Sequence, residues 1–278
     1  MVRTLIPISR SKIENIRALP TVPGSLKRIS SIIEKPSVSL EQIGRFISND
    51  PALATKVLKM VNSAVYGFPG RISSISHAIM LLGLNVVKGL LLGVSVFEIM
   101  EKMMSGLWVH SLGCAIAAGE IANKLNIKDP EEISVAALLH DIGKVIMILE
   151  YQKEYEGIIK EASTEECLIY DVEKTFFTET HTTVGMWLAG KWNFPRKLVE
   201  VIAYHHTPQS SRLAVKEAAI VHLADILVRA RGIGFAGDHF VPPLNAAAFE
   251  TLSLSSNDIR DVLVRIEETH QVSDDMVS

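Results

Sequence analysis

The feature that most constrains the fold is the recurrence of apolar residues every three or four positions along most of the chain. Leu53, Val57, Met60 and Val61 form one such stripe, and this spacing is typical of a helix that buries one face. Strict alternation of apolar and polar residues between hairpin turns, which would predict β-strands, is not found in the sequence. We therefore predict an all-α protein with little or no sheet.

Several of the predicted helices begin at recognisable capping residues. Ser39 and the glutamine three positions later have the form of a capping box. Asp50 precedes Pro51, so its carboxylate can accept hydrogen bonds from the first free amides while the proline occupies the first helical position. Asp129 and Pro130 repeat this arrangement. We expect all three aspartate or serine side chains to cap helices.

Two breaks in the helical pattern divide the chain into three segments. One break lies at 101–106, and the other is a loop at 232–244 that contains glycine and proline. The prediction is an N-terminal helical lobe over residues 1–103, a second helical lobe over 104–231, and a loop with a C-terminal helical segment over 232–278. The last helix is expected near 256–269.

Charge and cysteine usage exclude some classes of protein. The chain has 28 Lys and Arg against 31 Asp and Glu, a net charge of -3, with no long run of one sign. The basic face of a duplex-binding protein is therefore missing, which disfavours nucleic acid as a partner. Cys114 and Cys167 form no CxxC pair, which is typical of a reduced cytoplasmic protein. We expect neither cysteine to be a metal ligand.

The most apolar stretch, residues 77–100, could be mistaken for a membrane span. Asn85, Lys88 and Glu98 interrupt it, and the uninterrupted pieces are too short to cross a bilayer. We predict a buried helix with no membrane span, and we expect no signal peptide in residues 1–30.

A polar pair continues one of the apolar stripes. Ile133, Ala136, Ala137, His140 and Asp141 lie at helical spacing, so the histidine and the aspartate are expected to face inward. Adjacent helix positions point about 100° apart. The two side chains therefore cannot face each other, but a cation between them could contact both.

Further inward-facing donors lie on other predicted helices or at their ends: His110, His181, His205, His206 and Asp225. A lone carboxylate is costly to bury, so an aspartate in the apolar segment IVHLADILV requires a cationic partner. Imidazole and carboxylate groups suit divalent zinc, manganese, iron, nickel or cobalt, and ligand type alone does not choose among these metals.

Each candidate also has a purely structural interpretation. His140 and Asp141 could form a hydrogen-bonded pair, and a nearby histidine or amide could satisfy Asp225. One of the two histidines at 205–206 could complement the dipole at a helix C-terminus. Lys144 could be a solvated lysine at a helix end, and His110 could be a polar edge of the core.

The order of these residues carries a resemblance to a known superfamily. His110, His140 with Asp141, and Asp225 resemble the H…HD…D pattern of the HD metal-dependent phosphohydrolases, and His181 with the pair at 205–206 resembles the fuller set of the HD-GYP branch. The N-terminal half is more specific. Three motifs are similar in sequence and order to those of the HDOD family, the HD-related output domain of bacterial signalling proteins: ALPTVPGSL, ISNDPALATKVLKMVNSAVYG and ISSISHAIMLLG. The resemblance runs from about residue 18 to about residue 225.

The resemblance implies an N-terminal helical lobe packed on an HD-like helical lobe, with a role in signal transduction. By analogy with the family pattern, His110, His140, Asp141 and Asp225 would hold one divalent ion. His181, His205 and His206 would hold a second, with Asp141 bridging the two. Lys144 resembles the lysine that approaches phosphate in active relatives. The sequence after His206 is TPQSSRLA, which lacks the Gly-Tyr-Pro signature of the HD-GYP branch.

Two functions follow as hypotheses. The first is a cytoplasmic signalling output module with a metal site of one or two ions and a signalling protein as its partner. The second is a metal-dependent phosphohydrolase acting on a nucleotide or cyclic dinucleotide, with Lys144 and Asp141 as its catalytic residues. The complete ligand set favours the enzyme, whereas the HDOD-like N-terminal half and the missing signature favour the module.

Overall fold

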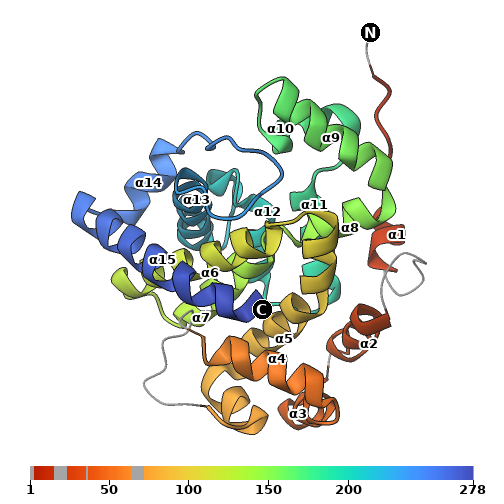
Figure 1. Ribbon diagram of the computed structural model, residues 1–278, viewed down its shortest axis with the longest axis vertical. Coiled ribbons are helices and arrows are strands. Elements are labelled where there is room, and N and C mark those ends of the chain that lie inside the picture. Colours follow the sequence, from red (N-terminus) through yellow and green to blue (C-terminus); the bar gives the residue numbers. More distant parts are fainter. Residues whose placement is uncertain (1–2, 16–23, 36, 64–71, 278) are drawn as a thin grey trace.

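The structure is a computed structural model that describes residues 3–15, 24–35, 37–63 and 72–277 (Figure 1). Within these ranges the chain is helical, and its one β-type pairing is an isolated bridge between Ile6 and Phe177. The prediction of an all-α protein is confirmed. Parts of two motifs behind the family resemblance, residues 18–23 and 64–67, lie outside the described residues.

The helices of the N-terminal part are α1 (Arg10–Glu14), α2 (Gly24–Ile33), α3 (Leu40–Ser48), α4 (Pro51–Val61) and α5 (Ile75–Met103). They are followed by α6 (Leu107–Lys124), α7 (Pro130–Leu139), α8 (Ile142–Glu150), α9 (Gln152–Thr164), α10 (Ile169–Phe176), α11 (His181–Lys191), α12 (Arg196–Tyr204), the short 3₁₀ turn η2 (Pro208–Ser210), α13 (Val215–Ala230), α14 (Ala246–Leu252) and α15 (Ser256–Val277). The last helix is longer than predicted.

Two of the three predicted caps are confirmed. The Ser39 hydroxyl accepts from the amide of Gln42, whose side chain accepts in turn from the Ser39 amide. Asp50 accepts from the amide of Leu53 at the start of α4. The predicted cap at Asp129 is wrong. That residue has a left-handed backbone (φ 55°, ψ 58°) and makes no capping hydrogen bond, because a capping side chain normally extends from β-region backbone.

Helix α5 is the longest helix of the described residues. It is kinked at Gly83 (φ 77°) and is the one described helix whose length and composition would allow it to cross a membrane. Asn85 and Lys88 do not divide it as we expected, and the side chain of Glu98 lies outside the described residues. However, 72% of its apolar window is buried inside the protein, so the prediction of a buried helix is confirmed.

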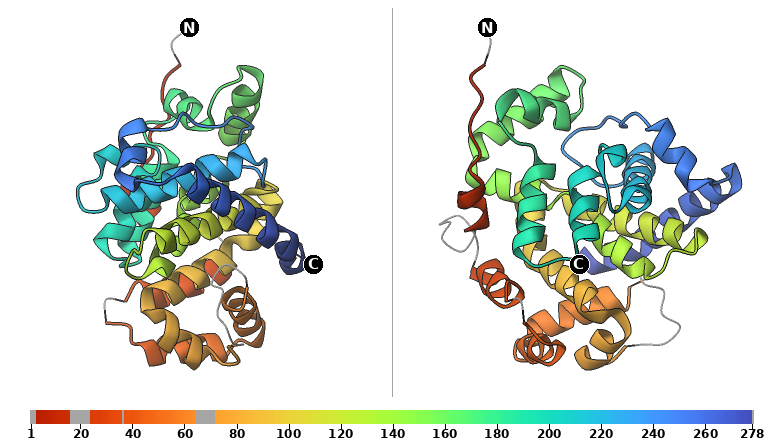
Figure 2. Two further views of the ribbon diagram at one scale, coloured as in Figure 1. Left: turned by 90° about the vertical axis from the view of Figure 1, so that its left-hand side faces the viewer. Right: turned by 180° about the vertical axis from the view of Figure 1, so that it is seen from behind.

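The helices gather into two groups that share α5. Helices α2, α3 and α4 pack on α5 at one end of the molecule, as Figure 2 shows from two further sides. Helix α5 also contacts α6, α7 and α8. Helix α1 lies apart from α2 to α4 and packs on α11, while α14 and α15 pack on α13 and α6. The division into three segments with the predicted boundaries stays a prediction.

The junction between the two groups is built around Trp192, which directly follows α11 and is fully buried. Its indole N–H donates to the hydroxyl of Ser30 in α2, at 3.2 Å. Its carbonyl accepts from the ammonium of Lys88 in α5, at 3.4 Å. Burial lowers the pKa of Lys88. One residue thus holds α2, α5 and α11 together.

Candidate metal centre

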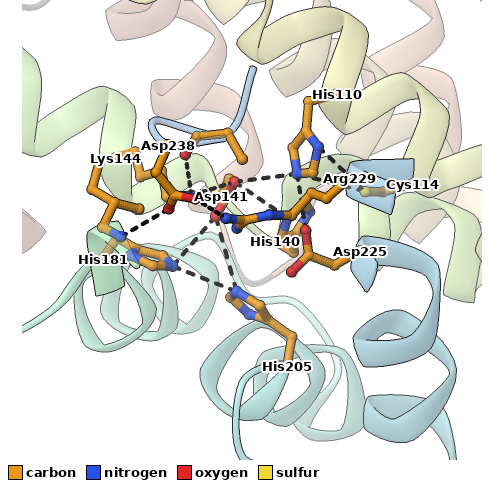
Figure 3. A network of polar contacts seen from close by, with 12 residues as sticks. His110, Cys114, His140, Asp141, Lys144, His181, His205, Asp225, Arg229 and Asp238 are labelled. Carbon is orange, nitrogen blue, oxygen red and sulfur yellow. Dashed lines mark hydrogen bonds and ion pairs between the residues drawn. The ribbon is translucent and has the colours of Figure 1, made fainter. Parts of the chain in front are cut away.

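The polar pair lies at the junction of two helices. Helix α7 ends at Leu139 and α8 begins at Ile142, so His140 and Asp141 do not continue a single helical stripe as predicted. His140 keeps helical backbone angles, but Asp141 has φ -97° and ψ 10°. This break in the helix aims both side chains at one buried point (Figure 3). Both residues are 1% exposed.

Two of the predicted ligands are oriented by the ends of their own helices. Nδ1 of His140 donates to the carbonyl of Ala137, at 2.5 Å, and Nδ1 of His205 donates to the carbonyl of Ile202, at 2.8 Å. Each carbonyl lies in the last turn of a helix, where few amides of that helix remain to donate to it, and the carbonyl of Ala137 also accepts from the His140 amide at 3.4 Å. The bond places the proton on Nδ1, so the lone pair of Nε2 is free to bind a metal.

His181 is oriented by a carboxylate that the sequence analysis missed. Glu173 in α10 is fully buried and accepts from Nδ1 of His181 at 2.7 Å and from the His181 amide at 2.9 Å. Its other oxygen accepts from the hydroxyl of Tyr155 at 2.5 Å. A carboxylate that holds the far nitrogen of a histidine is a recurrent feature of metal sites. The available signal was its place one helical turn after Ile169, on the inward face of α10.

The free Nε2 atoms converge on Asp141. Oδ2 of Asp141 lies 3.3 Å from Nε2 of His140 and 3.7 Å from that of His110. Oδ1 lies 3.3 Å from Nε2 of His181 and 3.9 Å from that of His205. Oδ1 has no hydrogen-bond partner within the described chain. One carboxylate therefore stands between two pairs of histidines.

Asp225 from α13 supplies the second carboxylate. Its Oδ1 lies 3.3 Å from Nε2 of His110, yet neither of its oxygens makes a hydrogen bond to any described residue, although the side chain is buried. His110 is thus its ion-pair partner, and the alternative in which a nearby histidine satisfies this carboxylate stays open. Burial alone would raise the pKa of Asp225, but His110 and Arg229 hold it well below its usual value.

A second group of donors adjoins the first. Nε2 of His181 lies 3.2 Å from Nε2 of His206 and 3.5 Å from Nε2 of His205, and one ligand atom from each of these histidines lies within 4.8 Å of the others. His206 is only partly buried. Burial, with His140 and His181 nearby, holds the pKa of His205 well below its usual value, so this imidazole is neutral, the form that binds metals.

Lys144 is buried, so the alternative in which it is a solvated lysine at a helix end is wrong. It is 1% exposed, and its ammonium donates to Oδ2 of Asp141 at 2.7 Å and to the carbonyl of Ala236 at 2.8 Å. Burial alone would raise the pKa of Asp141, but His140 and Lys144 hold it well below its usual value. The role of Lys144 toward a phosphate stays a prediction.

Residues 232–245, which we call the strap, fold over the centre between α13 and α14. Asp238 anchors the strap through an ion pair with Arg229 and by accepting from the amide of Ile169, at 2.8 Å. Gly234 has φ 68° and lies so close to the backbone of His110 that a Cβ there would overlap it. The strap therefore closes the centre on the side of His110 and Lys144.

The buried charges around the centre do not balance. Lys144 and Arg229 supply two fixed positive charges, and although burial alone would lower the pKa of His140, the neighbouring Asp141 raises it. These cations face four buried carboxylates: Asp141, Glu173, Asp225 and Asp238. Uncompensated buried charge is unstable unless a partner is present. The donor set, the unsatisfied carboxylate oxygens and the excess negative charge all fit a divalent cation.

One further donor was predicted not to be a ligand. Cys114 lies one helical turn after His110 on α6 and is fully buried, with its Sγ 3.6 Å from Nε2 of His110. One ligand atom from each of Cys114, His110, His140 and Asp225 lies within 4.8 Å of the others. The interval of four residues was the available signal.

Comparison with known proteins identifies a family for this chain. The family model of the HDOD domain matches residues 19–208. An uncharacterized protein of Treponema pallidum is 32% identical over 212 residues, which is 72% of this chain and 40% of that protein. Ribonuclease Y of Thermus thermophilus is 30% identical over 122 residues, 44% of this chain and 16% of that protein. The chain thus spans less than half the length of either relative.

Two solved structures share the fold. An HDOD domain protein of unknown function from Geobacter sulfurreducens superposes with a TM-score of 0.69 at 24% identity, covering 96% of this chain and 99% of that one. A candidate phosphohydrolase from Shewanella amazonensis gives a TM-score of 0.60 at 21% identity, covering 91% and 97%. Both support the all-helical architecture.

Proposed function

The chain belongs to the HDOD family, and on that premise we propose that it is a signal-transduction output module built around a divalent-metal centre. The single observation that supports the metal is the convergence of free Nε2 atoms on buried carboxylates whose oxygens lack hydrogen-bond partners. His110, His140, Asp141 and Asp225 would hold one ion. His181, His205 and His206 would hold a second beside Asp141.

The closed surroundings favour a regulatory role over catalysis. All of the proposed ligands except His206 are buried, and the strap covers one side of them. Lys144, the residue expected to approach a phosphate, is bound to Asp141 and to the strap instead. A metal held only by the folded chain would stabilise the arrangement of α6, α7, α11, α12 and α13 relative to one another. We propose that a signalling protein, acting in the cytoplasm, recognises this arrangement.

A second candidate is a metal-dependent phosphohydrolase acting on a nucleotide or cyclic dinucleotide. The completeness of the ligand set and the similarity to ribonuclease Y favour it. A bound divalent ion would supply Lewis acidity toward a phosphoryl oxygen and a more acidic water. The chain itself would have to release Lys144 from Asp141 and move the strap to admit a substrate.

One preparation separates these functions. Metals in the untagged protein are measured by elemental analysis, and turnover of cyclic dinucleotides and simple phosphodiesters is followed with added manganese or iron. We expect near-stoichiometric metal without turnover. His140→Ala and Asp141→Ala should lose the metal, while His77→Ala, an exposed histidine of α5, should keep it. Turnover that both site variants abolish would replace the module with the enzyme, and failure to bind any divalent ion would refute the metal centre.

A further inference from the structure

We infer that Cys114, rather than Asp141, is the fourth ligand of the ion held by His110, His140 and Asp225, which makes this half of the centre a mixed sulfur, nitrogen and oxygen site. The inference rests on the proposed metal centre and adds to it a sulfur donor and a preference among metals. The sulfur is supplied by α6, the same helix that supplies His110.

The position of the thiol follows from helix geometry. Side chains four residues apart on a helix lie on the same face, about 5–6 Å apart at Cβ. Cys114 and His110 therefore both face the interior, where each is 0% exposed. Sγ lies 3.6 Å from Nε2 and 4.0 Å from Nδ1 of the His110 ring. Because both ring nitrogens are almost equally near, the sulfur lies beside the ring and not along the Nε2 lone pair, which stays available.

The spacing of the donors matches a tetrahedral ion. With metal–sulfur and metal–nitrogen bonds of about 2.3 and 2.1 Å, tetrahedral angles place sulfur and nitrogen about 3.6 Å apart, and nitrogen and oxygen about 3.4 Å apart. The observed separations are 3.6 Å from Sγ of Cys114 to Nε2 of His110, and 3.3 Å from that nitrogen to Oδ1 of Asp225. The pairwise separations match those of ligands of one ion, and rotation of the Cys114 side chain about its Cα–Cβ bond would bring Sγ from beside the ring to the side of the Nε2 lone pair.

A second observation points to a ligand at the same place. The carboxylate of Asp225 is 1% exposed, lies within 4.8 Å of the sulfur, and has both oxygens without a hydrogen-bond partner among the described residues. A thiol facing an unsatisfied carboxylate and two imidazoles is poorly accommodated in an apolar core. A cation shared by all four donors satisfies the carboxylate and gives the sulfur a partner.

The chemical consequence is selectivity. Thiolate is a soft donor that selects zinc or iron, and imidazole suits both, whereas carboxylate, carbonyl and water donors suit magnesium, calcium and manganese. The neighbouring group, His181, His205 and His206, contains no sulfur. The two halves of the centre should therefore differ, with zinc or iron(II) preferred over manganese at the half that contains Cys114.

The test uses the full chain, stripped of metal with a chelator and then given one equivalent of zinc or cobalt. X-ray absorption at the zinc edge should show a sulfur neighbour at about 2.3 Å. Cobalt should give the near-ultraviolet charge-transfer band of a thiolate ligand. Cys114→Ala and Cys114→Ser should lose that band, bind zinc at least about tenfold more weakly and discriminate less between zinc and manganese. Cys167→Ser, a partly buried cysteine outside the cluster, is the matched control and should change none of these.

The outcomes separate this inference from the metal centre itself. Bound zinc with only nitrogen and oxygen neighbours would overturn the role of Cys114 and leave the centre intact. Absence of any bound zinc or cobalt would overturn both. The absorption measurement on the unaltered protein decides the matter even if neither Cys114 variant folds.

Discussion

Glu173 offers the sharpest test of how the centre is organised, because its carboxylate joins the core to one proposed ligand. It accepts from Tyr155, from the backbone amide of His181 and from Nδ1 of the same histidine. Glu173→Gln keeps the shape and one acceptor oxygen but removes the negative charge. Glu173→Ala removes the acceptor altogether.

Glu173→Gln should affect mainly the affinity for metal, whereas Glu173→Ala should also lower the stability of the fold. Loss of the carboxylate that orients a ligand histidine typically weakens metal binding 10–100-fold, which is about 1.4–2.8 kcal/mol. Glu173→Gln should therefore weaken binding by that amount and leave the metal-free fold intact. Glu173→Ala leaves three buried donors without an acceptor, at roughly 1–3 kcal/mol each. The total of about 3–9 kcal/mol is comparable with the whole stability of a domain.

The assay is calorimetric titration of zinc into metal-free protein, together with thermal unfolding in the presence of a chelator. Glu161→Gln makes the same chemical change at a surface ion pair with Arg3 and should alter neither measurement. If Glu173→Gln bound zinc as tightly as the unaltered protein, His181 would not be a ligand oriented by this carboxylate. Wild-type stability of Glu173→Ala would refute the hydrogen-bond argument.

Three further predictions test other parts of the structure. A Cβ at Gly143 would overlap the backbone of α11, so Gly143→Ala should destabilise the metal-free protein by about 1–3 kcal/mol, measured by thermal unfolding, and should weaken zinc binding. The control is Gly157→Ala, where a Cβ would make ordinary contacts, and it should change neither the stability nor the zinc affinity. Removing one member of a buried ion pair costs about 3–5 kcal/mol, so Arg229→Gln should speed proteolysis of the strap at least tenfold. The control is Arg231→Gln at a surface ion pair, and equal proteolysis rates for the two variants would contradict the role of Arg229 in anchoring the strap. Partial burial would raise the pKa of Glu200, but one hydroxyl and two amides of the turn after α12 donate to its carboxylate and lower it. The ionised form therefore stabilises the fold above the unfolded-state pKa, so Glu200→Gln should lower the melting temperature at pH 7, and the difference should vanish as the pH falls through the lowered folded-state value.

The fold class could be predicted because helical stripes are a local property of the sequence. Ser39 and Asp50 cap their helices as expected for the same reason. The break between α7 and α8 was missed, since LLHDIGK contains no proline and its glycine lies inside α8. Gly143 is there because α11 passes too close for any Cβ, a tertiary contact that no local pattern reveals.

In the candidate site too, some features follow from local sequence patterns and others depend on tertiary contacts. The predicted ligands each end or continue an apolar stripe, so their inward direction could be expected, although their role as ligands stays a prediction. The inward direction of Glu173 could have been expected from its place one turn after Ile169, but its contact with His181 could not, and neither could the strap, because these contacts are set only by the folded chain. The burial of Lys144 depends on the carbonyl of Ala236, 92 residues later in the sequence.

Helix α11 gives the molecule a mechanical connection between its two groups of helices. It begins at the proposed ligand His181, and Trp192 follows its last residue. Eleven residues rise about 16 Å, so a stiff rod runs from the polar interior to the hydroxyl of Ser30 and the ammonium of Lys88. A tilt of this rod at either end must displace the other. Loss of an ion at His181 would thus be transmitted as a shift of α2 and α5 on the opposite side, where a partner could sense it without contacting the ion.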